Sequence, residues 1–302
     1  MSARFPLALV ALLAACAPPI QPEPAPLPTR GEVTAQQWAA GCTEWDEWDK
    51  PAPPFRIYGN TYYVGTCGIS AILITGADGH ILIDSGTEAG AAVVMDNIRK
   101  LGFRLNEIAM ILHSHEHFDH VGGHAAIQQA SGAHVFASPE AVEVLRSGRD
   151  NPADPQAGMH PPMKPVPVEV VIREGEFVRT EDTIVTAIAT PGHTPGALSW
   201  TWQACEEGNG CKQIVYADSL SPIGSETYRF SDHPEYLAAF RSGLDRLAGK
   251  TCDILLTPHP SASGMVARAA AGSLLGGADC AGYAASIRTR LDAKLAEERA
   301  GG

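Results

Sequence analysis

Ile111-Leu112-His113-Ser114-His115-Glu116-His117-Phe118-Asp119-His120 is the most informative stretch of this 302-residue chain. Its polar part carries four histidines and two carboxylates and follows the apolar segment Ile108–Leu112 directly. The apolar segment predicts a short buried strand, so the polar run begins at a strand's carboxyl end, where sites of α/β proteins gather. Imidazole and carboxylate are ligands that suit Zn²⁺. Such a cluster, between a strand and Gly122-Gly123, favours a metal site over a solvated loop.

The spacing of these side chains indicates two metal ions. In an extended backbone alternate side chains point to the same side, so His115 and His117 can reach one ion. Asp119 and His120 are adjacent, and a turn can direct both of them at a second ion.

Two later histidines can supply the third ligand of each ion. His193 lies in the loop Thr190-Pro191-Gly192-His193-Thr194-Pro195-Gly196, whose prolines and glycines fix the backbone. His259 lies just past an apolar segment and between two prolines. Three ligands per ion, with open positions for water, is the pattern of a catalytic zinc site. The sequence therefore predicts a dinuclear zinc hydrolase, in which the two ions lower the pKa of a shared water.

Apolar segments and helical periodicities alternate along both halves of the chain. We expect strands at residues 69–75, 80–84, 108–112, 133–137, 166–172, 183–189, 198–204, 213–217 and 253–256, and helices at 88–101, 121–130, 234–247 and 284–298. This alternation predicts an α/β protein with two sheets packed together and covered by helices on the outside.

The N-terminus predicts export. Arg4 precedes an apolar run that ends at Ala15, which is too short to span a bilayer and is typical of a signal peptide, residues 1–15. Its end resembles the lipobox of bacterial lipoproteins, so we expect Cys16 to carry a lipid; ordinary cleavage after Ala15 or Ala17 is the alternative. Residues 16–30 form a proline-rich tether, and residues 31–302 form the folded domain. We expect a periplasmic protein, bound to the membrane only through this lipid.

Composition and cysteine content agree with this location. The net charge of −12 and the lack of a basic stripe argue against nucleic acid as a partner. Six cysteines remain after Cys16, an even set that suggests three disulfides in an exported chain. A hairpin turn separates Cys205 from Cys211, and near-neighbour pairing of the others is the simplest option: Cys42 with Cys67 and Cys252 with Cys280. No Cys-x-x-Cys spacing indicates a zinc site built from cysteines.

The His-x-His-x-Asp-His run, the Gly-His-Thr-Pro-Gly loop and the last histidine resemble the metallo-β-lactamase superfamily, and subclass B3 in particular. That likeness extends to Tyr58–Gly65, Tyr216–Pro222 and His259-Pro260-Ser261. The resemblance implies an αβ/βα four-layer sandwich of two mixed sheets flanked by helices. It also implies two zinc ions, the first held by His115, His117 and His193 and the second by Asp119, His120 and His259.

The resemblance further implies hydrolysis of the β-lactam amide of penicillins, cephalosporins and carbapenems. We expect a monomer, since nothing in the sequence looks like an obligate interface. Asp119 would help to orient the hydroxide, and Ser219 and Ser221 would contact substrate or water. A lactonase or thioester hydrolase of the same fold is the alternative, with Asp218 as a residue that bridges the metals. A second alternative is a lipoprotein that binds zinc without catalysis.

Three residues depart from the family pattern. His113 is expected to be packed behind the ligands, and Glu116, between two ligands, is expected to affect substrate access. His160 lies in a proline-rich stretch that can border the cleft.

Overall fold

The computed structural model describes residues 31–300. The expected signal peptide and the whole expected tether, Cys16 included, lie outside the described residues. Within them no helix is long and apolar enough to cross a membrane.

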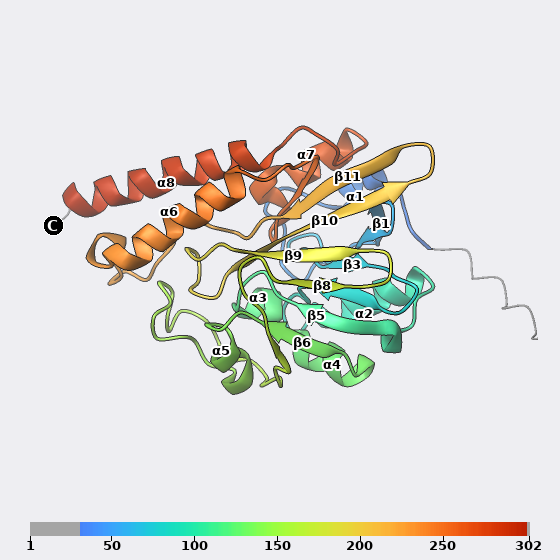
Figure 1. Ribbon diagram of the computed structural model, residues 1–302, viewed down its shortest axis with the longest axis horizontal. Coiled ribbons are helices and arrows are strands. Elements are labelled where there is room, and N and C mark those ends of the chain that lie inside the picture. Colours follow the sequence, from blue (N-terminus) through green and yellow to red (C-terminus); the bar gives the residue numbers. More distant parts are fainter. Residues whose placement is uncertain (1–30, 301–302) are drawn as a thin grey trace, which may run out of the picture.

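Two β-sheets form the centre of the molecule (Figure 1). The first has the order β1-β2-β3-β4-β5-β6-β7, with bounds Phe55–Tyr58, Thr61–Tyr63, Ile72–Ile74, His80–Ile83, Ile108–Leu112, His134–Ala137 and Val170–Val171. The second has the order β12-β11-β10-β9-β8, with bounds Ile254–Leu256, Gly210–Tyr216, Leu198–Glu206, Ile184–Ala189 and Phe177–Arg179. Each sheet mixes parallel and antiparallel pairs, since β4 pairs parallel with β5 and antiparallel with β3, and β11 likewise with β12 and β10.

Helices cover the outer face of each sheet (Figure 1). The α-helices are α1 Ala35–Gly41, α2 Ala91–Lys100, α3 Phe118–Val121, α4 His124–Ser131, α5 Val142–Ser147, α6 Pro234–Ala248, α7 Met265–Ala270 and α8 Cys280–Ala300; the 3-10 turns are η1 Leu105–Glu107, η2 Phe230–Asp232 and η3 Pro260–Ser263. Helices α6 and α8 lie together on one outside of the molecule, and α2 and α4 lie on the opposite outside.

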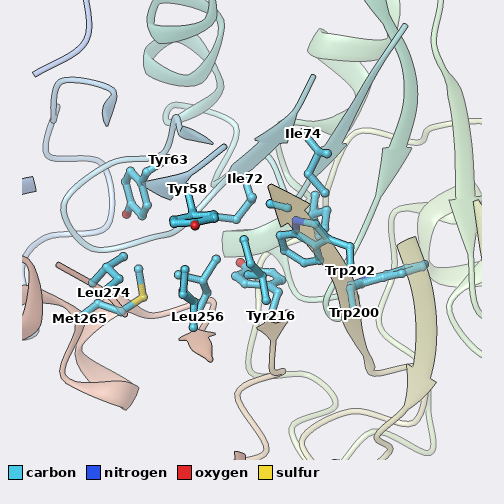
Figure 2. Packing of buried hydrophobic residues seen from close by; sticks show 14 of the residues in the cluster. Tyr58, Tyr63, Ile72, Ile74, Trp200, Trp202, Tyr216, Leu256, Met265 and Leu274 are labelled. Atoms are coloured by element: carbon cyan, nitrogen blue, oxygen red, sulfur yellow. The ribbon is translucent and has the colours of Figure 1, made fainter. Parts of the chain in front are cut away.

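Alternation of side chains along the strands explains this four-layer arrangement. Ile72 and Ile74 belong to the core between the sheets, which Figure 2 shows, whereas Leu73 faces the helices outside the first sheet. In the second sheet Tyr216 faces the central core, and Val215 packs under α6 and α8. Strands that are apolar on both faces need cover on both sides. The predicted two-sheet sandwich with outer helices is confirmed.

Two predicted elements differ in the structure. The helix expected at residues 121–130 is divided between α3 and α4 at Gly122 and Gly123. A Cβ at Gly122 would meet the Phe118 carbonyl oxygen at 2.3 Å, and one at Gly123 would meet the Ser85 carbonyl oxygen at 2.6 Å. The strand expected at residues 166–172 is reduced to Val170–Val171, because Pro165 and Pro167 lack the N–H that a ladder needs.

Three disulfides join cysteines that are neighbours in the sequence. The pairs are Cys42–Cys67, Cys205–Cys211 and Cys252–Cys280, the same pairs that the simplest pairing gives. The second joins directly opposed residues of β10 and β11. The third joins the segment before β12 to the start of α8, and so helps to hold that helix on the second sheet.

Candidate metal centre

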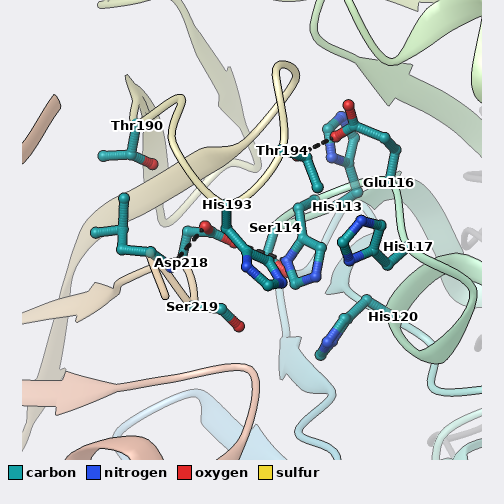
Figure 3. A network of polar contacts seen from close by, with 12 residues as sticks. His113, Ser114, Glu116, His117, His120, Thr190, His193, Thr194, Asp218 and Ser219 are labelled. Atoms are coloured by element: carbon teal, nitrogen blue, oxygen red, sulfur yellow. Dashed lines mark hydrogen bonds and ion pairs between the residues drawn. The ribbon is translucent and has the colours of Figure 1, made fainter. Parts of the chain in front are cut away.

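The predicted ligands meet at one edge of the sandwich, where strands of both sheets end. The ligand run follows β5, the loop with His193 follows β9, Asp218 follows β11 and His259 follows β12. Figure 3 shows His117 and His120, at the start of α3, close to His193, which lies in the loop after β9. The fold therefore brings together residues that lie up to 144 positions apart, from His115 to His259.

Asp84 fixes the start of the ligand run. Its Oδ1 accepts a hydrogen bond from the Ser114 N–H at 2.6 Å, and its Oδ2 accepts from Ser114 Oγ and from the Tyr216 hydroxyl, each at 2.7 Å. Asp84 is fully buried and has a φ of 62°, a left-handed conformation that aspartate tolerates better than most residues. This carboxylate therefore holds the two sheets together just behind the ligands.

His115, His117 and His193 form the first cluster, called here the first trio. Each offers one ring nitrogen within 4.8 Å of the others, a spacing that can hold one metal ion. All three side chains are buried. The expected first set of ligands is thus brought together.

Each imidazole of the first trio has one ring nitrogen within hydrogen-bond distance of a polar group. His115 Nδ1 lies 2.7 Å from Asp218 Oδ1, and His193 Nδ1 lies 3.0 Å from the Ser221 carbonyl oxygen. His117 uses its other nitrogen, since Nε2 lies 2.9 Å from Asp154 Oδ2. A backbone carbonyl only accepts, so His193 Nδ1 carries the hydrogen and Nε2 keeps its lone pair for a metal.

Burial keeps His115 and His193 neutral. It lowers the pKa of His115 and of His193 well below the ordinary value, and the neighbouring imidazoles add to the effect. Neutral imidazole is the form that binds metal. The same cause raises the pKa of Asp218 well above its usual range, because this carboxyl is fully buried behind His115.

Asp119, His120 and His259 form the second trio. Asp119 Oδ2 lies 3.0 Å from His120 Nε2 and 3.4 Å from His259 Nε2. Asp119 and His120 share a second metal-sized cluster with His115, whereas His259 lies outside that cluster, with its ring 4.9 Å from the ring of His120. Its side chain is 19% exposed, more than the other two.

Charge pairing dominates the second trio. Burial opposes a charge on His120, but the Asp119 carboxylate outweighs it and raises the pKa of His120 to about 10. Burial also acts to raise the pKa of Asp119, yet His120 and His259 together bring it well below its ordinary value. Without a metal, Asp119 and His120 therefore form an ion pair.

The donor set fits zinc. Among the described residues, the buried His115 Nε2 and both ring nitrogens of His120 make no hydrogen bond, although His120 Nε2 lies close to Asp119. Unpartnered buried polar atoms are costly, and a metal ion would satisfy them. Five imidazoles and one carboxylate, without a thiolate, are suitable ligands for zinc.

A cleft of about 240 Å³ opens over both trios. Trp45, Trp48 and Ile223 give it apolar walls, and these three side chains are 69%, 42% and 45% exposed. Among the described residues that line it, only Arg290 has a permanent positive charge. Both predicted serines line the cleft as well: Ser221 Oγ lies 3.1 Å from His193 Nδ1, and Ser219 Oγ is buried without a hydrogen bond.

The structure corrects the expectation for Glu116. This side chain is buried and turned away from the cleft, where Oε2 accepts from Thr194 Oγ1 at 2.6 Å and Oε1 from the Gly196 N–H at 2.9 Å (Figure 3). Burial raises the pKa of Glu116 to about 6, although the Thr194 hydrogen bond opposes the shift. Glu116 thus joins the His193 loop to the ligand run, because the alternation that aligns His115 with His117 directs it to the opposite side.

The other uncertain residues take distinct places. His113 is fully buried, and its Nε2 accepts a hydrogen bond from the Ser138 N–H at 3.1 Å. His160 lines the cleft, with its ring 4.3 Å from that of His117. Asp218 contacts the far nitrogen of His115, and no metal-sized cluster among the described residues includes it.

Several residues at the site were not predicted. Asp84, Asp154, Gln156 and Arg290 lie in separate parts of the sequence and belong to no compact motif. Trp45 and Trp48 stand in a short segment rich in aromatic and acidic residues, which is a weak signal. Of these residues only Asp84 had a clear signal in the sequence, because it stands at the end of a predicted strand, where site residues gather.

Solved structures resemble this chain over almost their whole length. The metallo-β-lactamase MIM-2 is 54% identical, with 88% of this chain and 98% of that chain covered and a TM-score of 0.84. MIM-1 from Novosphingobium pentaromativorans is 46% identical, with 89% and 99% covered and a TM-score of 0.85. MEM-A1, a subclass B3 metallo-β-lactamase from a soil metagenome library, is 42% identical, with 85% and 100% covered and a TM-score of 0.80.

Curated sequences give a more distant likeness. A hydroxyacylglutathione hydrolase from Bradyrhizobium sp. (strain ORS 278) is 26% identical over 153 residues, 48% of this chain and 49% of that protein. The chain spans about half the length of the curated relatives it matches. The model of the metallo-β-lactamase superfamily matches residues 64–206. With the near-complete match to MIM-2 and MEM-A1, the chain belongs to the metallo-β-lactamase superfamily and, within it, to the subclass B3 enzymes.

Proposed function

We propose that this protein is a zinc enzyme that hydrolyses the amide bond of β-lactam antibiotics, with penicillins, cephalosporins and carbapenems as its substrate class. The observation that carries the proposal is the pair of ligand clusters that share His115 and open into one cleft. The near-complete resemblance to named metallo-β-lactamases supports the choice of substrate.

The two trios would hold two zinc ions. His115, His117 and His193 would bind the first, and Asp119, His120 and His259 the second. Zinc bound there would supply a water of lowered pKa and polarise the carbonyl of the amide. The chain's own residues would set the position of everything else.

Asp119 and the cleft walls would position the reactants. Asp119 Oδ1 can accept a hydrogen bond from the attacking water and so orient it toward the amide carbon. Trp45 and Trp48 lie beside His259, with ring centroids 6.3 and 5.9 Å from its imidazole. They can cover the apolar body of the substrate and exclude bulk water.

The opposite side of the cleft suits the polar part of these substrates. These β-lactams carry a carboxylate next to the ring, and Arg290 can pair with it. Ser219 Oγ is buried without a partner and can donate a hydrogen bond to the same group or to water. Orientation by a fixed cation and a hydroxyl would place the amide over the metal ligands.

The direct test is turnover of a carbapenem by purified, zinc-loaded protein, followed by loss of ring absorbance. We expect hydrolysis that a chelator abolishes and added zinc restores. No turnover at micromolar enzyme would refute the proposal. A glutathione thioester assayed in parallel tests the hydroxyacylglutathione hydrolase alternative, which the 26% identity supports. Zinc binding without hydrolysis of any lactam, ester or thioester would favour a lipoprotein that binds zinc without catalysis.

We further propose that the protein is a periplasmic monomer, anchored by a lipid on Cys16. Three disulfides suit an oxidising compartment. Replacing Cys16 with Ser should release the protein from the membrane fraction, and unchanged fractionation would contradict lipidation. Light scattering of the chain without residues 1–16 should give the mass of one chain.

A further inference from the structure

We propose that Asp154 is a positioning residue that fixes His117 for metal binding and couples metal occupancy to the loop bordering the cleft. This loop, residues 148–169, connects α5 with β7. The inference rests on the proposed role of His117 as a metal ligand.

The contact with His117 determines which nitrogen is free. Asp154 Oδ2 lies 2.9 Å from His117 Nε2, and only 3% and 4% of the two side chains are exposed. A carboxylate oxygen accepts, so Nε2 carries the hydrogen and Nδ1 keeps its lone pair for the metal. In His115 and His193 the partnered nitrogen is Nδ1 instead. Asp154 therefore selects the opposite tautomer at one position of the first trio.

The same aspartate ties the loop to the site. Asp154 Oδ1 accepts a hydrogen bond from the Gln156 N–H at 2.7 Å. The Pro155 carbonyl oxygen accepts from the Ser225 N–H at 2.8 Å, which joins the loop to the segment after Ser221. Residues 154–156 thus connect His117, which follows β5 of the first sheet, with the cleft wall that follows β11 of the second sheet.

Through these contacts, a metal bound at His117 would affect residues that face the substrate. Gln156 and His160 both line the cleft. The His160 ring packs on His117, and Gln156 Nε2 lies 3.4 Å from His193 Nδ1. A metal that fixes His117 also fixes the partner of Asp154, so the loop should become more ordered when zinc binds. Without zinc, Asp154 still orients His117, but the ring lacks the second attachment that a metal would provide.

The test compares the wild type with Asp154→Asn and with the control Asp150→Asn. Asp150 lies in the same loop and accepts from the Gly158 N–H at 2.8 Å through Oδ2, with no bond to a ligand. Zinc affinity is measured by competition with a chromophoric chelator. Hydrogen exchange of residues 150–160 is followed with and without zinc, and circular dichroism checks folding.

We expect zinc to increase protection of residues 150–160 in the wild type. In Asp154→Asn the affinity for the tightest zinc should fall about 10- to 100-fold, the range for lost outer partners of ligands, and zinc should no longer protect the loop. Asp150→Asn should keep its zinc affinity within about twofold while its loop exchanges faster.

Two results would overturn the inference. One is a zinc affinity of Asp154→Asn within about twofold of the wild type. The other is a wild-type loop whose exchange is insensitive to zinc, which decides the matter even if the variant does not fold. Both readouts are independent of β-lactam turnover, so a protein that binds zinc but hydrolyses no β-lactam would refute the proposed function alone.

Discussion

The two trios occupy one cleft but are held in opposite ways. In the first, His115, His117 and His193 each have one nitrogen fixed from behind by another group. In the second, Asp119 contacts His120 and His259 directly, and Asp84 Oδ2 lies 3.7 Å from Nδ1 of His120, too far for a hydrogen bond. The first trio is therefore arranged for a metal before it binds, whereas the second must exchange an internal ion pair for metal contacts. We infer that the first trio binds zinc more tightly.

The largest effects are expected from two variants that each remove one ligand, one from each trio. His193→Ala should lower kcat/KM by more than about a hundredfold, beyond the effect of losing an outer partner, and should remove the tightly bound zinc. His259→Ala should retain one zinc per chain after dialysis, because the first trio is intact. Metal analysis of the dialysed proteins checks this, and equal zinc content in the two variants would contradict it.

Weakening a partner behind the first trio is a milder change. Asp218→Asn replaces the carboxylate that faces His115 Nδ1, so zinc affinity should fall by roughly 10- to 100-fold. Chelator competition measures the effect. The control is Ser199→Ala, which removes the acceptor of the Asp218 N–H at 2.9 Å but leaves the carboxylate in place. An Asp218→Asn protein with wild-type affinity would show that the support from behind has no role.

A change in the cleft should leave both trios unaltered. Arg290→Ala should raise KM for a carbapenem about tenfold with little change in kcat, because it removes binding to a carboxylate distant from the reacting bond. High salt should reduce the difference. The control is Arg288→Ala on the same helix, where Nη2 pairs with Asp245 at 2.6 Å. Similar KM values for the two variants, or a loss of zinc from Arg290→Ala, would contradict this role.

The smallest expected effect concerns stability far from the trios. Glu298 accepts from the Phe230 and Ser231 N–H groups, each at 2.9 Å. Burial acts to raise the pKa of Glu298, but these hydrogen bonds bring it below its ordinary value. Its stabilising effect is therefore complete above the unfolded pKa of about 4.3 and is lost as pH falls through the lower folded value.

Glu298→Gln should accordingly reduce the free energy of unfolding by about 1 kcal/mol at neutral pH and by less in acid. Urea unfolding of the metal-free proteins at pH 7 and at about pH 3 measures this difference. Zinc content should match the wild type. A loss that grows on acidification would reverse the expected sign.

Local patterns in the sequence indicated much of the fold and the gathering of the ligands. Apolar segments marked most strands, and alternation placed His115 and His117 on one side. The same rule places Glu116 on the other side, where it is found. The short helices α1 and α5 were not predicted, since seven and six residues give little periodicity. Tertiary packing forms them instead, as the fully buried Trp38 of α1 indicates.

Residues behind the ligands could not be predicted in the same way. Asp154 lies 37 positions from His117, in a loop without periodicity, and Asp84 comes 30 positions before Ser114. Their proximity results from how the loops close over the ends of the sheets. Local propensity carries no information about such closure, so the support of the first trio became visible only in three dimensions.

The most direct test of the contrast between the trios is a zinc titration of the metal-free protein, followed by NMR of the imidazole nitrogens. We predict fixed tautomers before zinc is added, with the hydrogen on Nδ1 of His115 and His193 and on Nε2 of His117. The first equivalent of zinc should shift the signals of these three residues, and the second those of His120 and His259. Averaged tautomers in the first trio, or a first equivalent that reaches His120 and His259, would contradict the account.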